Sequence, residues 1–183
     1  MDDIVAAQNA LAEAIRQNDP DKRAAAVRPL MHSEFWIVQV SVLSALGDSG
    51  PKSLPALRAI LKDEELRKFH NDAIRALGKA GGAEVGPELT ELLKQEHAFW
   101  KKTAPGLPNA WWNGDGLNWE EVERLRNHYC VAQAAIIALG EIRHSGGREA
   151  VIEFRDYWKS LPQLDFDQMQ NACETALKKM RHP

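Results

Sequence analysis

Residues 45–78 read ALGDSGPKSLPALRAILKDEELRKFHNDAIRALG, a stretch bounded at each end by the tripeptide Ala-Leu-Gly. The copies are Ala45-Leu46-Gly47 and Ala76-Leu77-Gly78, and a third, Ala138-Leu139-Gly140, follows the second at twice the interval between the first two. A degraded fourth copy stands at Ala176-Leu177-Lys178. An apolar residue precedes each copy by seven positions and a small or short one by three, which is helical spacing. The sequence therefore predicts a helical repeat whose period is the interval from Ala45 to Ala76.

A second helix is expected after each of the first copies. The turn at Asp48-Ser49-Gly50 leads into Pro51, which suits a first helical turn, and an apolar stripe follows at Leu54, Leu57, Ile60 and Leu61. We expect the glycine of Ala-Leu-Gly to end the first helix, because glycine adopts the left-handed conformation at little cost. A helix–turn–helix unit cannot bury its own apolar face, so the units must stack as a solenoid.

These residues resemble the short bacterial HEAT repeat, also called the phycobilisome-lyase HEAT-like repeat, over about residues 20–96 and 128–180. The resemblance implies an all-α, right-handed α-solenoid that forms a single domain over residues 1–183. Typical repeats of this type carry an arginine six residues before the alanine of the tripeptide. Here those positions hold other residues, so we expect no Asp/Arg ladder and more reliance on apolar packing; they are Gln39, His70, Ala132 and Gln170.

The period is interrupted once, by a Trp-rich segment. Residues 97–118 contain two prolines and three glycines, which oppose a regular helix, and we expect an irregular insertion there. Helix resumes after Asn118, a favourable N-cap, and a capping helix is expected at about 165–180. Four of the six tryptophans lie between Trp100 and Trp119.

The tryptophans admit two interpretations. They are predicted to form a partner-binding surface, because tryptophan is enriched in binding hot spots; the candidates are Trp100, Trp111, Trp112 and Trp119. The alternative is that the rings fold back and fill the gap in the interrupted stack, since a long loop needs apolar anchors. A mixture of buried and exposed rings is also consistent with the sequence.

The second helices of a HEAT solenoid line its concave face, so their charges predict how a partner would be oriented. The expected second helices at 21–31, 51–62, 83–96 and 147–160 carry net charges of +2, +3, −3 and 0. The groove is therefore predicted to be basic at its N-terminal end and acidic beside the Trp-rich segment. The candidate basic contacts are Arg23, Arg28, Lys52 and Arg58.

Several classes of function are disfavoured. The chain has 23 basic and 26 acidic residues, a net charge of −3, which makes nucleic acid an unlikely partner. No catalytic motif or cofactor-binding loop is present, and the six histidines form no ligand pair at helix spacing, so we predict no catalytic, cofactor or metal site. The acidic start of the chain lacks the pattern of a signal peptide, and no apolar run is long enough for a membrane span, so we expect a cytoplasmic protein with no membrane partner.

The leading hypothesis is a non-enzymatic scaffold or adaptor that binds another protein or peptide on the concave face and the Trp-rich segment. The resemblance implies one alternative, a tetrapyrrole (bilin) lyase or chaperone-like subunit whose aromatic rings would stack a flat pigment. A second alternative is a HEAT-type DNA-repair glycosylase, which needs a basic cleft with tryptophan and a catalytic aspartate. The acidic third helix and the net charge oppose that alternative.

Overall fold

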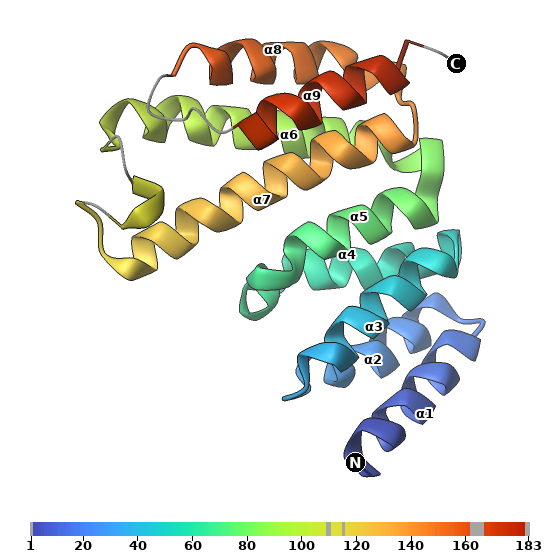
Figure 1. The fold of residues 1–183 in the computed structure, drawn as a ribbon. Helices are drawn as coiled ribbons and strands as arrows, with labels where there is room; N and C mark the ends of the chain where they lie inside the picture. The colour runs from blue at the N-terminus through green and yellow to red at the C-terminus, as the bar shows by residue number, and fades with distance from the viewer. Residues whose placement is uncertain (1, 109–110, 115, 162–166, 182–183) are drawn as a thin grey trace. The chain divides into compact units, whose positions relative to one another are not determined.

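The structure, a computed structural model, describes residues 2–108, 111–114, 116–161 and 167–181 (Figure 1). The predicted all-α class is confirmed, because these residues form α- and 3-10 helices and no strand. Among them, no helix combines the length and apolar character that crossing a membrane requires. The chain divides into two compact units, Met1–Gly82 (unit 1) and Ala83–Pro183 (unit 2). That both belong to one right-handed solenoid domain stays a prediction.

Unit 1 consists of helix pairs in two layers. Helices α1, α3 and α5 form one layer, and α2 and α4 form the other, with contacts between successive members of each layer. Short 3-10 turns join α3 to α4 and α4 to α5. The bounds are α1 Asp2–Arg16, α2 Pro20–Met31, α3 Trp36–Asp48, η1 Pro51–Ser53, α4 Leu54–Lys62, η2 Glu64–Phe69 and α5 His70–Gly81.

Unit 2 also packs its helices in pairs, and two of them, α6 and α7, are longer than any helix of unit 1. Helix α7 packs on α6 and α9, and α8 packs on α6 and α9. The 3-10 turn η3 leads into this unit. The bounds are η3 Gly82–Val85, α6 Gly86–Thr103, η4 Ala104–Gly106, η5 Trp111–Asn113, α7 Trp119–Glu141, η6 Ser145–Gly147, α8 Arg148–Lys159 and α9 Asp167–Lys179. The predicted capping helix thus corresponds to α9, and residues 162–166 lie outside the described residues.

The glycine of the Ala-Leu-Gly motif has a different role from the one predicted. Gly47 and Gly140 lie inside α3 and α7, and the left-handed residues of the first two turns are Gly50 and Gly82. A Cβ atom at Gly47 would lie 3.3 Å from the Cα atom of Ala76, and one at Gly140 only 2.6 Å from that of Ala176. The equivalent helix of the next repeat therefore crosses close to the glycine at both positions, and the space is tighter at Gly140 than at Gly47.

The prediction that irregular structure begins at residue 97 was wrong. Helix α6 continues to Thr103, because Leu93, His97 and Trp100 extend its apolar stripe and are all buried. The helix ends where Pro105 removes a backbone donor. The predicted N-cap of the next helix is confirmed, since the side-chain oxygen of Asn118 accepts the backbone N–H of Glu121 at 2.8 Å.

Two of the positions at which typical repeats carry ladder arginines bind loop carbonyls instead. Gln39 is buried, and its amide nitrogen donates to the carbonyl of Met31 at 2.8 Å and to that of Ser33 at 3.0 Å. One repeat later, His70 Nε2 lies 3.1 Å from the carbonyl oxygen of Asp63. Each side chain thus ties the start of a first helix to the end of the preceding second helix.

Candidate functional site

A pocket lies in unit 1 between α2, α4 and η2, on the layer predicted to contact a partner. Its volume of about 540 Å³ is within the usual range of ligand pockets. The apolar lining is formed by aliphatic side chains from the three elements, namely Ala24, Ala25, Val27, Ala56, Ala59, Ile60 and Leu66.

The pocket exists because alanine occupies the facing positions of two neighbouring helices. Ala24 and Ala25 of α2 and Ala56 and Ala59 of α4 all line it, and a methyl group fills little of the space between the two helices. Beneath them Val27, Ile60 and Leu66 are buried. A pocket with this lining favours an aliphatic or aromatic side chain over a polar one.

The rim carries charges of both signs. Arg28 and Lys62 supply positive charge, and Asp63 and Glu64 supply negative charge. A guanidinium nitrogen of Arg28 lies 3.9 Å from a carboxylate oxygen of Asp63, but the Arg28 side chain is 76% exposed. Such an exposed pair contributes little to folding and remains available to a charged partner.

Of the four predicted basic contacts, only Arg28 lines the pocket. The prediction for Arg23 was wrong, because its side chain is buried and turned towards the α1–α2 connection. Its guanidinium donates to the carbonyls of Ile15 and Gln17 at 2.8 Å. Lys52 is exposed and Arg58 is half-buried, and neither lines the pocket.

The guanidinium of Arg23 also donates to Ser53 Oγ at 3.0 Å. Because Ser53 belongs to η1, this hydrogen bond links α2 to the next helix pair. Arg23 is therefore a structural residue of unit 1 and not a residue of the pocket rim. The position of Arg23 in the helical pattern could not indicate this role. An arginine that faces solvent and an arginine that folds over a loop can occupy the same position of a helical pattern.

Two tryptophans of the Trp-rich segment belong to the core of unit 2. Trp100 and Trp111 are fully buried, so the prediction that they bind a partner was wrong. Trp100 meets Trp158 edge to face, with ring centroids 5.2 Å apart, and Trp111 lies 5.8 Å from Trp100. Burying these rings stabilises the segment, because each ring removes a large apolar area from water. The gap-filling alternative therefore holds for these two rings.

Trp112 and Trp119 are placed differently from the buried pair. Trp112 is half-buried, and Trp119, at the start of α7, is 60% exposed. The guanidinium of Arg126 lies between them, 5.0 Å from the Trp112 ring and 4.9 Å from the Trp119 ring. It also donates to the carbonyl of Trp112 at 2.6 Å, which fixes η5 against α7. Partner binding by Trp112 and Trp119 stays a prediction.

Burial shifts the pKa values of three groups in unit 2, His97, Tyr129 and Cys173, in the direction that favours their neutral forms. Burial, with a smaller contribution from Lys101, lowers the pKa of His97. Burial also raises the pKa of Tyr129 to about 12 and that of Cys173 to about 12. These groups are neutral at physiological pH, as packed core residues are, and a buried thiol of this kind is a poor nucleophile.

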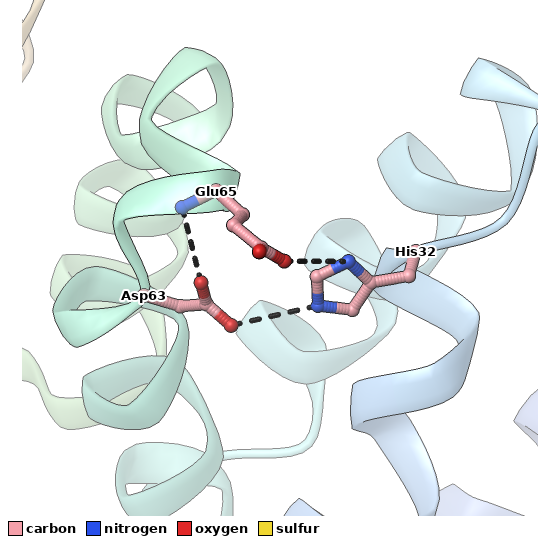
Figure 2. Close-up of side chains that lie close together, drawn as sticks. All are labelled: His32, Asp63 and Glu65. Atoms are coloured by element: carbon pink, nitrogen blue, oxygen red, sulfur yellow. Dashed lines mark hydrogen bonds and ion pairs between the residues drawn. The ribbon is translucent and has the colours of Figure 1, made fainter.

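One group of polar residues is not evident from motifs within a single helix. His32, Asp63 and Glu65 lie together at the ends of α2 and α4, as Figure 2 shows. His32 and Asp63 are separated by the same interval as Ala45 and Ala76, which is one repeat, and each is the C-cap of its helix. The repeat period is the signal that could have found them, because stacked repeats bring equivalent positions side by side.

Residues 28–104 match the sequence family described as HEAT repeats. No curated protein and no solved structure matches the chain. The matched stretch runs from the second half of α2 to the end of α6 and includes α4 and η2, which form most of the pocket. The expected HEAT-repeat character is thus confirmed for this part of the chain. HEAT repeats commonly serve as scaffolds for protein interaction.

Proposed function

We propose that this chain is a non-enzymatic protein- or peptide-binding module and that the pocket of unit 1 receives an apolar side chain of the partner. The observation that carries the proposal is the alanine-lined hollow between α2 and α4, two second helices in a stretch that resembles HEAT repeats. Repeat proteins of this kind bind partners through the surface that such helices form.

The rim limits which segment fits. We expect an apolar anchor residue of the partner to contact Val27 and Ile60. The cations Arg28 and Lys62 and the carboxylates Asp63 and Glu64 would then lie near it. A partner segment with charges of both signs beside its anchor therefore satisfies the rim best. Such complementarity sets orientation and selectivity, and the buried anchor supplies most of the affinity.

The two alternatives receive less support. A tetrapyrrole lyase of the phycobilisome type would stack its pigment on exposed rings, but two of the four candidate rings, Trp100 and Trp111, are fully buried. A DNA-repair glycosylase would combine a basic cleft with tryptophan, but no tryptophan lines the pocket, whose rim is of mixed charge. The pocket therefore favours a peptide segment over a pigment or DNA.

The proposal is tested by selecting peptides from a random displayed library on the full-length chain. The pocket is then closed by Ala59→Phe, which places a ring over the hollow at an exposed position. The matched control is Ala12→Phe, an exposed alanine of α1 outside the pocket. Affinities of the selected peptides are measured by fluorescence anisotropy against all three proteins.

The selected peptides are expected to share one apolar residue and to bind Ala59→Phe at least about tenfold more weakly, as loss of a hot-spot contact predicts. Binding to Ala12→Phe should equal binding to the wild type. Peptides that bind all three proteins equally well would place the interaction elsewhere and reject the pocket.

A further inference from the structure

The cluster of His32, Asp63 and Glu65 brings one imidazole and two carboxylates together from two neighbouring repeats. Figure 2 shows the imidazole of His32 pointing from the end of α2 into the space between the two carboxylates. His32 Nε2 lies 3.5 Å from Asp63 Oδ2, and His32 Nδ1 lies 3.8 Å from Glu65 Oε2. One ligand atom from each residue lies within 4.8 Å of the other two.

One of these separations, between His32 and Asp63, matches that of a metal centre. Around a tetrahedral zinc ion with bonds of about 2.0–2.2 Å, ligand atoms lie about 3.3–3.6 Å apart. The separation of His32 Nε2 and Asp63 Oδ2, 3.5 Å, already meets this condition. Glu65 now faces the other ring nitrogen, Nδ1, whose lone pair points to a different side of the ring, so its 82% exposed side chain has to turn towards Nε2 to reach the same ion.

Asp63 is held in position before any ion arrives. Its Oδ1 atom accepts the backbone N–H of Glu65 at 3.1 Å, and its own carbonyl oxygen is held by His70 Nε2. Its side chain is only 18% exposed, and Oδ2 is the atom turned towards His32. A carboxylate fixed in this way binds a cation with less loss of side-chain entropy than a free surface carboxylate.

One neighbouring cation competes for the same oxygen. Arg28 approaches Asp63 Oδ2 to 3.9 Å, but its side chain is 76% exposed and can turn into solvent when a doubly charged ion binds. We therefore expect Arg28 to lower the affinity of the cluster for a cation but not to prevent its binding.

We propose that His32, Asp63 and Glu65 bind a zinc-type divalent cation at the rim of the unit 1 pocket. An imidazole ligand selects zinc and similar transition metals over magnesium and calcium, which prefer oxygen ligands alone. Three protein ligands leave the fourth tetrahedral position to water or to a donor atom of a bound segment. The ion-binding proposal stands independently of peptide binding, since all three ligands come from this chain.

The experiment is calorimetric titration of the full-length, chelator-treated chain with zinc chloride, repeated with magnesium chloride. The variants are His32→Gln, Asp63→Asn and Glu65→Gln, with Glu34→Gln as the control, because Glu34 is an exposed carboxylate close in sequence but outside the cluster. Asparagine is as good a cap as aspartate, so Asp63→Asn preserves the turn at η2. Circular dichroism checks that all proteins are equally helical.

The wild type is expected to bind one zinc ion, with magnesium at least about tenfold weaker. Each of the three ligand variants should lose roughly tenfold or more in zinc affinity, at least the loss seen when outer-shell partners are removed. Glu34→Gln should match the wild type. The proposal is overturned if the wild type shows no saturable binding, or if any folded ligand variant keeps the wild-type affinity.

Discussion

Unit 1 and unit 2 follow the same helix-pair plan but bury different kinds of side chain. Unit 1 buries Arg23 and Gln39, both of which donate to backbone carbonyls of the connections between helices. Unit 2 also buries polar side chains, among them Glu96 and His97, but its largest buried groups are aromatic rings. The indole N–H groups of Trp100 and Trp158 have no hydrogen-bond partner among the residues that the structure describes.

The difference shows two ways to stabilise the same architecture. In unit 1, hydrogen bonds hold the loops and small side chains keep the α2–α4 layer open, which leaves the pocket. In unit 2, the large apolar area of the rings offsets the polar groups left without partners, since each ring removes about 150–250 Å² from water. A binding hollow is compatible with the first arrangement, whereas the second fills the space.

The largest expected effect separates the two environments of tryptophan. Trp100→Ala in unit 2 is expected to cost about 3–5 kcal/mol of unfolding free energy, because it empties a fully buried ring site. Trp36→Ala in unit 1 should change stability by no more than about 0.5 kcal/mol, because that ring is 68% exposed. Urea unfolding followed by circular dichroism measures both. Equal losses would mean that the contrast between the units is wrong.

The next effect concerns the buried arginine. Arg23→Ala is expected to destabilise unit 1 by about 2–3 kcal/mol, because carbonyl groups that accept charge-assisted hydrogen bonds lose their donor. Its matched control is Arg28→Ala on the same helix, which removes an exposed pair worth at most about 0.5–1 kcal/mol. The same urea experiment decides, and a control as damaging as Arg23→Ala would contradict the structural role.

A smaller effect compares equivalent glycines. Gly140→Ala should destabilise unit 2 by about 1–3 kcal/mol, because the new methyl group would overlap the backbone of Ala176. Gly47→Ala has more space against Ala76, and the gain of about 0.5–1 kcal/mol from replacing glycine in a helix offsets the crowding. Calorimetric melting temperatures should therefore fall for the first variant and stay near the wild type for the second.

The smallest effect is a pH dependence. Burial lowers the pKa of His97 below its ordinary value of 6.5, so the unfolded chain binds the proton first as the pH falls. The contribution of His97 to the free energy of unfolding is therefore fully present above pH 6.5, and it is lost as the pH falls through the lower pKa of the folded state. His97→Phe keeps a ring beside Phe154 and Tyr157 and cannot titrate. Melting temperatures at several pH values should fall less steeply for this variant, and parallel curves would refute the assignment.

The helices were predictable because they repeat. The interval between the Ala-Leu-Gly copies and the apolar stripes are visible in the sequence, and the N-cap at Asn118 is a local signal. The extension of α6 to Thr103 was not predicted, because the prolines and glycines that follow oppose a helix and the sequence alone does not show that His97 and Trp100 are buried. Burial decided that segment, and burial depends on partners distant in sequence.

The site was less predictable than the fold. A basic residue such as Arg23 looks the same in the sequence whether it faces solvent or a carbonyl, and an alanine gives no sign that it lines a hollow. The gathering of His32 with Asp63 follows from the repeat period, but only when positions are compared between repeats. Motif searches along one helix cannot detect ligands that approach from two.

The unequal distribution of tryptophan has a consequence for spectroscopy. Trp36 is the sole tryptophan of the sequence before residue 83, and the other five follow it. Intrinsic emission is therefore mainly a signal from Ala83–Pro183, and Trp36→Phe would make it entirely so, whereas far-ultraviolet dichroism records the helices of both units. A delay between the two signals during unfolding would reveal which of the two units unfolds first.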